Sequence, residues 1–541
     1  MQTLADIDFA ALTQRPFHPS PAAWEDQVFY FFLLDRFSDG NEAGYRDNSG
    51  NLAVGGSTPL LQSADHGNAV GAEADAASWR DAGARFVGGT LRGAMSKIGY
   101  LKRLGVSAIW VSPVFKQPPW SDAYHGYGVQ DFLAIDPRFG SREDLHELVE
   151  TAHAHGIHVI LDVILNHAGP VFSYAADRYP TEHGMDPRWD GRPYPVAGWN
   201  DAAGQPSLPY GQPVNDPDAA IWPRELQAAD DFSRLGRINN WDWYPEFIEG
   251  DFFDLKDIRL GEGEVDHFRI SPALKTLTRA YQYWIAYADL DGFRVDTVKH
   301  MEPGATRYFT ACIHEFAQSI GKEQLVDDHD QVRKGDHKAR FCAGGGTRLA
   351  ANVLALNALT LGIPCIYYGS EQGLDGAGGN DRYIREAMFG GDFGAFRSRG
   401  RHCFDENHPI YVELARLLGV RRQHLALRRG RQYLRAISGN GHDFGAPRLI
   451  GSELRSVVAW SRLFTDREWL CAINTDDTSE QAAWVGLDHD LSPLGHALVC
   501  LYCSDPARIG GRLEVASPHP DWHAVWLALP AAGCAVYGPA D

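Results

Sequence analysis

The chain is poor in positive charge and in long apolar runs, and both shortages exclude classes of protein. Lysine and arginine number 50 against 70 acidic residues, which gives a net charge of −20 at pH 7. A chain of this charge is not expected to bind a phosphate backbone or an anionic membrane. No apolar run is long enough to span a bilayer, and residues 1–9 do not resemble a signal peptide. We therefore expect neither nucleic acid nor a membrane as a partner.

Cysteine is also scarce. The eight cysteines are scattered, and only Cys500 and Cys503 stand at a spacing that zinc sites use. Because no second pair accompanies them, zinc is not expected there. Scattered thiols of this kind fit a reduced protein best, so we predict a cytoplasmic location. With 541 residues and no internal repeat, the chain has ample core for one large domain and a smaller one.

The sequence does contain short apolar strands that end on polar side chains. In the run 291–300, Arg294 and Asp296 lie two positions apart, so they share one face of a strand, and the guanidinium favours the ionised carboxylate. Three more segments carry histidine, aspartate, asparagine or tyrosine at a turn or strand end: 124–127, 161–167 and 325–330. Barrel enzymes collect catalytic groups at the carboxyl ends of several strands, so the four segments predict one shared site.

Periodicity indicates where regular structure lies. We expect helices at 91–104, 142–155, 272–288, 304–320 and 347–361, and strands at 27–34, 107–111 and 364–367. Residues 169–258 are rich in proline, tryptophan and aspartate with little periodicity, which is typical of functional loops. Beyond residue 432, short strands at 457–462, 469–474, 497–503 and 524–529 predict a β-sandwich. The spacing of three histidines, His153, His155 and His158, resembles that of a metal site. They lie at a helix end and the following strand start, on the side opposite the predicted site, which favours an ordinary structural role.

In order and wording, these segments resemble the α-amylase family of glycoside hydrolases (glycoside hydrolase family 13). The resemblance runs from 28–37 to 362–369 and includes 88–93 and 101–113; each motif alone is weakly specific, but their joint order is strongly specific. It implies an α/β fold, a (β/α)8 barrel with a subdomain inserted after the third strand. The predicted division is a leader at 1–24, barrel at 25–168, insertion at 169–258, barrel at 259–431 and C-terminal β-sandwich at 432–541.

The resemblance also implies roles for single residues. Asp296 is the expected nucleophile, Arg294 its electrostatic partner, and Asp330 the carboxylate that favours the oxocarbenium-like transition state. The substrate-binding residues implied in the same way are Tyr127, His125, His167, His329, Lys299 and His300. Asn166 belongs to a structural calcium site in this scheme, and Asp162 supports the motif that contains it. No organic cofactor is implied.

One catalytic group has no counterpart in the sequence. A retaining glycosidase needs a second carboxyl, the general acid, about 5–5.5 Å from the nucleophile. The family carries this glutamate at the end of the fifth strand, between the motifs of Asp296 and Asp330. Here those residues are only about 34 positions apart, whereas each βα unit needs about 30 residues. We therefore predict a deletion near Glu323–Leu325, which removes about two βα units and leaves six recognisable strands.

No other carboxyl replaces the missing acid convincingly. Glu302 and Glu315 lie just after the fourth strand or on the helix that follows it, and Glu323 precedes a strand, which puts it at the wrong end of the barrel. A structural role is the better interpretation of Glu371. Asp328, which stands where the family usually has asparagine, is the best substitute by chain order. It is, however, shorter than glutamate and adjoins Asp330.

Three functions follow from these observations. The leading hypothesis is a retaining enzyme for α-glucosidic bonds of starch, glycogen or maltooligosaccharides, whether hydrolase or transglycosylase, with severely reduced turnover because the acid is lost. The second is a non-catalytic glucan-binding protein that keeps the sugar subsite. The third is an unrelated metal-dependent hydrolase that uses the cluster Asp327, Asp328, His329, Asp330 and His167.

Overall fold

A computed structural model of the chain describes residues 1–65, 72–175, 187–320, 338–447, 449 and 453–540. A parallel sheet lies at its centre, with the strand order β14-β7-β4-β1-β16. The strands are β1 (Phe29–Phe32), β4 (Ala108–Val111), β7 (His158–Val163), β14 (Gly292–Val295) and β16 (Cys365–Tyr367). β4 and β14 are buried along their whole length, as near-continuous apolar strands are when helices cover a parallel sheet.

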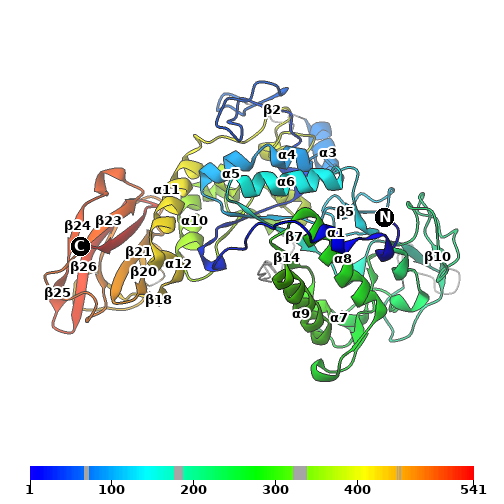
Figure 1. Cartoon of the computed structure of the whole chain (residues 1–541). Helices are drawn as coiled ribbons and strands as arrows, with labels where there is room; N and C mark the ends of the chain where they lie inside the picture. The colour runs from blue at the N-terminus through cyan, green and yellow to red at the C-terminus, as the bar shows by residue number, and fades with distance from the viewer. Residues whose placement is uncertain (66–71, 176–186, 321–337, 448, 450–452, 541) are drawn as a thin grey trace.

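Helices pack around this sheet. Figure 1 shows α4, α5 and α6 along its upper side and α8 and α9 below it. The bounds are α4 (Leu91–Met95), α5 (Ile98–Leu104), α6 (Arg142–Ala154), α8 (Pro272–Ala288), α9 (Pro303–Ser319), α10 (Ala350–Leu359), α11 (Pro409–Gln423) and α12 (Leu425–Arg429). Among the described residues, none of the helices has the length and apolar character needed to cross a membrane.

Five of the six predicted strands lie within the described residues. The sixth, at 325–330, lies outside them. The α/β architecture with a parallel sheet is confirmed, whereas the loss of βα units stays a prediction.

The predicted helix at 91–104 is wrong in one respect, because it is two helices with a break at 96–97. The Ser96 hydroxyl donates to the carbonyl of Gly93, and Lys97 leaves helical geometry. The Lys97 ammonium is buried 2.9 Å from the Glu42 carboxylate and 3.7 Å from the ring centre of Tyr45. A buried charge needs such a partner, and the turn of the chain delivers it.

The segment between β7 and α8 contains little regular structure. It holds β8 (His167–Ala168), β9 (Phe172–Tyr174), β10 (Val196–Trp199), α7 (Glu246–Glu249) and β11 (Lys256–Asp257). Phe172, Trp199, Tyr210 and Phe232 form its aromatic core. β11 pairs with β8, so the segment returns to the strand end from which it left.

The C-terminal part consists of two antiparallel sheets, as predicted. One sheet has the order β18-β20-β21-β27-β23-β24 and the other β19-β22-β26-β25. Their strands are β18 (Arg431–Leu434), β19 (Ile437–Ser438), β20 (Val457–Phe464), β21 (Arg467–Asn474), β22 (Gln481–Gly486), β23 (Ala497–Cys503), β24 (Arg512–Glu514), β25 (Ala516–His519), β26 (Trp522–Leu529) and β27 (Cys534–Pro539). Their inward side chains form a separate hydrophobic core. All eight cysteines are free thiols.

The remaining short elements lie in loops and at the rim. They are α1 (Phe9–Leu12), α2 (Leu34–Phe37), α3 (Glu73–Ala82), β2 (Glu42–Ala43), β3 (Thr58–Pro59), β5 (Phe115–Lys116), β6 (Asp131–Ile135), β12 (Gly261–Glu262), β13 (Arg269–Ile270), β15 (Lys338–Ala339) and β17 (Ala377–Gly378).

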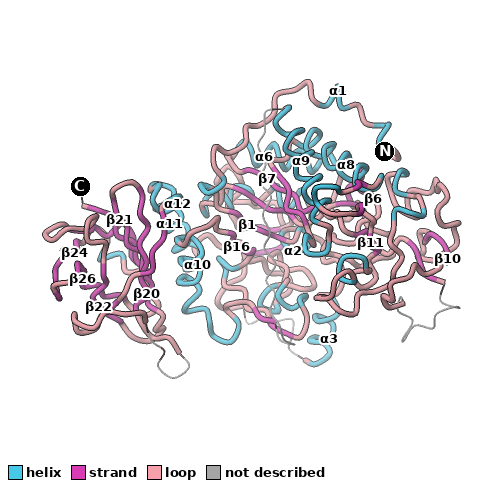
Figure 2. The backbone as a smooth tube through the Cα atoms, turned by 90° about the horizontal axis from the view of Figure 1, so that it is seen from below, coloured by secondary structure: helices cyan, strands magenta, loops and turns pink. Residues whose placement is uncertain are grey.

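Helices α10–α12 lie between the C-terminal sheets and the parallel sheet (Figure 2). Nη1 of Arg462, on β20, donates to the carbonyl of Leu359 at the end of α10 at 2.8 Å, and the indole of Trp460 donates to the same oxygen at 3.2 Å. Arg421, on α11, donates to the carbonyl of Ala358 at 2.9 Å. All three side chains are almost fully buried. The last carbonyls of α10 are therefore satisfied partly from the neighbouring domain.

Candidate active site

A buried guanidinium between two carboxylates forms the centre of the site. Arg294 on β14 lies opposite Asp162 on β7 in the parallel register, and Asp296 follows directly after β14. Nη1 of Arg294 is 2.6 Å from Oδ1 of Asp296 and 3.2 Å from Oδ1 of Asp162. Strand alternation thus places the predicted nucleophile and its predicted partner side by side at the carboxyl end of the sheet.

Asp162 accepts more bonds than the sequence indicates. The hydroxyl of Tyr127 donates to its Oδ2 at 2.9 Å, and the indole of Trp110 donates to the same atom at 3.1 Å. Burial raises the pKa of Asp162 to about 7, while the Arg294 guanidinium opposes this rise. Arg294 also lies over the Trp110 ring, 5.2 Å from its centre. Asp162 therefore orients both Arg294 and Tyr127.

His167 and His125 line the same strand ends as neutral imidazoles. Burial lowers the pKa of His167 to about 4. Burial, together with the nearby Arg385 guanidinium, lowers the pKa of His125 to about 3. Nε2 of His167 is buried and has no hydrogen-bond partner among the described residues. Nδ1 of His125 accepts from the backbone N–H of Tyr127 at 3.2 Å. The unpartnered nitrogen of His167 can serve a ligand hydroxyl, because leaving it buried and unpaired is costly.

Lys299 and His300 follow Asp296 and contact the irregular segment. Nδ1 of His300 lies 2.6 Å from the carbonyl oxygen of Phe247, and Nζ of Lys299 lies 2.9 Å from Asp242. The His300 ring contacts the rings of Trp241, Phe247 and Phe252, and Phe253 packs against Trp241. This places apolar faces beside the polar cluster, an arrangement suited to a sugar ring.

Part of the predicted site lies outside the described residues: Glu323, Asp327, Asp328, His329 and Asp330. Three other carboxyls considered as general acids are described, and one of them, Glu315, is exposed on α9. Burial raises the pKa of Glu302 to about 6, but the charged groups that act on it are Glu249 and Arg259. Glu371 is fully buried and accepts from the hydroxyls of Tyr30 and Tyr100 at 2.8 and 2.9 Å, which is a core role.

The surroundings of Asn166 do not fit a calcium ion well. Calcium takes six to eight oxygen ligands. The strand β11, which pairs with the residues after Asn166, brings Asp257 but also Lys256, whose buried ammonium lies 3.7 Å from Asp251. That ammonium pairs with the Asp251 carboxylate beside Asp257, and no step below uses a metal.

Two side chains that contact the site residues were not predicted from the sequence. Trp110 belongs to the apolar run of β4, where nothing marks it as a partner of Asp162. Arg385 donates to the Tyr124 hydroxyl at 3.3 Å and lies far from the site in sequence. Only the fold brings these side chains together.

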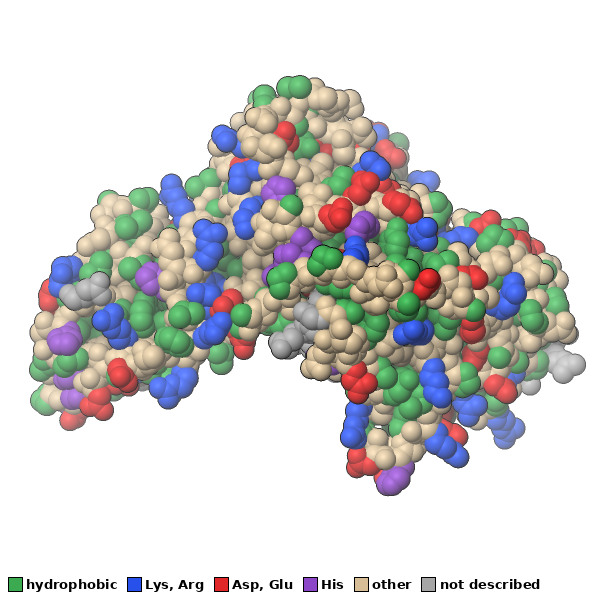
Figure 3. Space-filling view, viewed as in Figure 1, with side chains coloured by type: hydrophobic (Ala, Val, Ile, Leu, Met, Phe, Trp, Pro, Cys, Tyr) green, Lys and Arg blue, Asp and Glu red, His purple; other side chains and the backbone are tan. Residues whose placement is uncertain are grey.

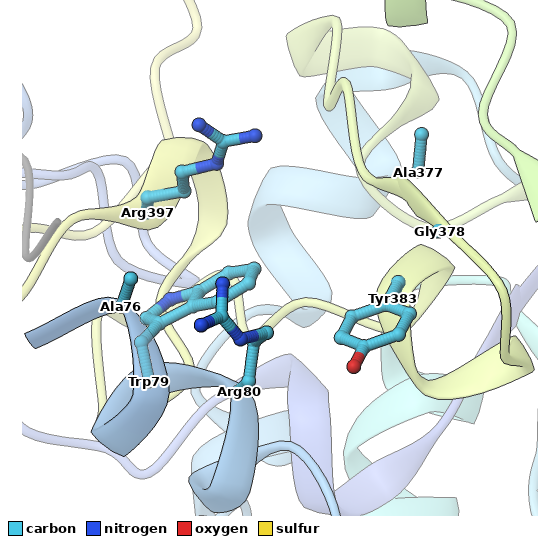
Figure 4. Close-up of a pocket in the computed structure, with 7 residues that line it drawn as sticks. All are labelled: Ala76, Trp79, Arg80, Ala377, Gly378, Tyr383 and Arg397. Carbon is cyan, nitrogen blue, oxygen red and sulfur yellow. The ribbon is translucent and has the colours of Figure 1, made fainter. Parts of the chain in front are cut away.

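A separate pocket of about 330 Å³ opens beside α3. Figure 4 shows Trp79 and Tyr383 facing a common space with the guanidinium groups of Arg80 and Arg397. Its lining contains none of the residues predicted from the sequence to bind substrate. The cluster of Arg294, Asp162 and Asp296 therefore lies elsewhere on the molecule.

Comparisons with known proteins agree with this geometry. A family model described as "Alpha amylase, catalytic domain" matches residues 31–195. An α-amylase of Streptomyces lividans is 26% identical over an alignment of 501 residues, which covers 74% of this chain and 52% of that protein. A cyclomaltodextrin glucanotransferase of Bacillus sp. (strain 1011) is 26% identical over 439 residues, which covers 67% of this chain and 51% of that protein. This chain thus spans about half the length of these two relatives.

A solved structure supports the fold. The α-amylase GTA of Geobacillus thermoleovorans, complexed with acarbose, superposes with a TM-score of 0.58 at 18% identity, over 96% of this chain and 100% of that chain. At this identity the likeness concerns the fold alone. Taken with the family model and the curated relatives, it supports one conclusion: the chain is similar in sequence and in fold to the α-amylase family of glycoside hydrolases.

Proposed function

We propose that this protein acts on α-glucosidic bonds of starch, glycogen or maltooligosaccharides by retaining double displacement, with Asp296 as the nucleophile. The contact of 2.6 Å between Arg294 Nη1 and Asp296 Oδ1, at the carboxyl end of β14, carries the proposal. A guanidinium in this position holds the carboxylate in place for attack. Relatives named α-amylase and cyclomaltodextrin glucanotransferase support the substrate class.

The reaction takes two displacements. The Asp296 carboxylate attacks the anomeric carbon, the bond to the leaving oxygen breaks, and that oxygen takes a proton. A glucosyl ester on Asp296 then reacts with water or with a sugar hydroxyl, which gives up a proton and releases the carboxylate. The acceptor alone separates hydrolysis from transglycosylation.

The described residues support a sugar subsite around Asp296. Tyr127 offers a ring face while its hydroxyl is held by Asp162, and His167 offers its buried Nε2. Phe252 stacks against the His167 ring at 5.8 Å between centres, which closes the subsite on one side. Rings and neutral imidazoles suit an uncharged polyhydroxyl ligand.

We further propose that turnover is severely reduced because the general acid is missing. Val295 ends β14 and Cys365 begins β16 roughly 70 positions later, whereas three further βα units of about 30 residues each belong in that interval of a full barrel. This spacing supports a shortened barrel. Loss of general-acid catalysis alone costs about 10²- to 10⁴-fold in rate.

Two substrates separate the nucleophile from the acid. α-Glucosyl fluoride has a leaving group that needs no protonation, whereas maltoheptaose needs it. We expect cleavage of the fluoride only, and D296N should abolish that cleavage. Normal turnover of maltoheptaose would refute the loss of the acid.

A third result points to the alternative function. If a folded sample cleaves neither substrate but binds maltoheptaose, and Y127A weakens that binding, the protein is a glucan-binding protein. The exposed rings of Trp243 and Tyr244, on the segment beside Lys299, favour retention of such binding. R307M, which changes an exposed arginine of α9, is the matched control for both assays.

A further inference from the structure

Three segments that are distant in sequence bring two histidines and an aspartate together at the opposite end of the sheet. His18 lies in the N-terminal leader, His158 begins β7, and Asp291 precedes β14. Oδ1 of Asp291 is 3.4 Å from Nδ1 of His158 and 3.9 Å from Nδ1 of His18. Figure 3 shows histidine side chains at the centre of the face across which the leader runs in Figure 1.

The other oxygen of Asp291 is held by two donors. Its Oδ2 lies 2.7 Å from Nε2 of His153 and accepts the backbone N–H of Val159 at 2.8 Å. The His18 ring stacks on the His153 ring, with 3.9 Å between centres. Oδ1 is thereby directed toward the two remaining imidazoles.

The Nδ1 atoms of His18 and His158 are both buried and have no hydrogen-bond partner among the described residues. An unpaired buried polar atom is costly, so two that face one fully buried carboxylate require an explanation. The separations of 3.4 and 3.9 Å are long for a hydrogen bond. One ligand atom from each of the two histidines and one from Asp291 lie within 4.8 Å of one another, a spacing at which one ion can contact all three.

We propose that His18, His158 and Asp291 bind one divalent transition-metal ion, with Zn²⁺ as the best fit. Two ligands of a tetrahedral zinc at about 2.1 Å stand about 3.4 Å apart, which matches the His158–Asp291 distance and needs a small shift of His18. Two imidazoles and one carboxylate suit zinc or cobalt, whereas calcium requires many more oxygens. The proposal is independent of the glucan chemistry.

Such an ion has a structural role here. The leader already contacts this end of the barrel, because the His18 backbone N–H donates to Asp289 and Arg15 donates to the carbonyls of Ala286 and Tyr287. A metal that joins leader, β7 and the start of β14 closes two long loops of chain. The sequence favoured a structural role for His153, His155 and His158; of these three, only His158 belongs to the proposed metal site, together with His18 and Asp291.

Metal titration tests the site. Protein without a polyhistidine tag is freed of metal with a chelator and titrated with Zn²⁺ alone or Co²⁺ alone. We expect one equivalent of Zn²⁺ per chain, a visible absorption typical of tetrahedral Co²⁺, and a rise in melting temperature with Zn²⁺ but not with Ca²⁺. H18A and H158A should weaken binding by at least about 100-fold and remove the rise in melting temperature.

His155 supplies the matched control. It lies at the same junction, but its Nδ1 lies 2.8 Å from the carbonyl of Thr151 and its Nε2 3.3 Å from that of Asn48. H155A should bind Zn²⁺ like the unmodified chain. The proposal is overturned if the unmodified chain binds no Zn²⁺, or if H18A binds it as tightly as H155A does. H18A changes a leader residue, so folding failure of H158A leaves the test intact.

Discussion

Among the described residues, Arg294 is the only cation that contacts both Asp162 and Asp296, and replacing it by methionine removes this charge. Arg294, Asp162 and Asp296 are nearly fully buried. Methionine fills a similar volume, so the main loss is charge compensation. Breaking a buried pair leaves an uncompensated charge and typically costs about 3–5 kcal/mol. Since two carboxylates lose their partner here, we expect the free energy of unfolding to fall by about that amount at pH 8.

The loss should depend on pH, with a definite sign. Burial raises the folded-state pKa of Asp162 to about 7 from its ordinary value of 3.8, so its ionised form opposes folding. The stability that its protonated form contributes is present below about pH 4 and is lost as pH rises through about 7. Without Arg294 this pKa rises further. The deficit of R294M should therefore be smaller at pH 5.5, where Asp162 is protonated.

Urea unfolding, followed by circular dichroism and by tryptophan fluorescence, measures the loss in free energy of unfolding, provided that the two probes give the same transition. R294M/D162N should recover about 2 kcal/mol of the loss, since one uncompensated charge is gone. R307M is the control, because the Arg307–Asp266 bridge has a similar distance of 2.8 Å but is exposed, and such bridges contribute less than about 1 kcal/mol. A deficit of R294M no larger than that of R307M, or one that does not change with pH, contradicts the reasoning.

Three further changes test neighbouring features. Y127F removes the donor to the buried Asp162 carboxylate and should cost about 1–3 kcal/mol in the same urea assay; no loss would show that the hydroxyl is dispensable. Burial lowers the pKa of His167 to about 4, so its neutral form contributes up to about 3 kcal/mol of stability above pH 6.5, and this contribution is lost as pH falls toward 4. H167Q should therefore reduce the slope of the free energy of unfolding against pH between 6.5 and 4. An unchanged slope would contradict this role of His167. In G304A the new Cβ would lie 2.3 Å from the Phe268 ring. This steric clash should lower the melting temperature, even though alanine has a higher helix propensity than glycine. A higher melting temperature for G304A would contradict this reasoning.

Local patterns predicted the regular elements well. The helix predicted at 272–288 has those bounds in the structure, because Ser271 caps its first turn and Pro272 begins it. The strands at 107–111 and 364–367 differ from the predictions by one residue at most. Each depends on residues close in sequence, which a single sequence displays.

Long-range contacts were beyond such reasoning. The break at Lys97 depends on Glu42, 55 positions away, and the bond from Trp110 to Asp162 depends on strand pairing. Spacing alone placed Arg294 beside Asp296. The position of Asp162 as the second acceptor follows from the register of β7 and β14, which no local pattern encodes.

The contact between Arg462 and the end of α10 has a consequence for how the chain can be divided. A helix terminus carries partial negative charge on its last carbonyls, and here a side chain from another domain neutralises it at Leu359. Truncation before β18 would remove the Arg462 donor to Leu359 and would also expose apolar surface of α10. The C-terminal sheets are therefore not a detachable module, and barrel and sheets should melt in one calorimetric transition, with independent melting as the contrary result.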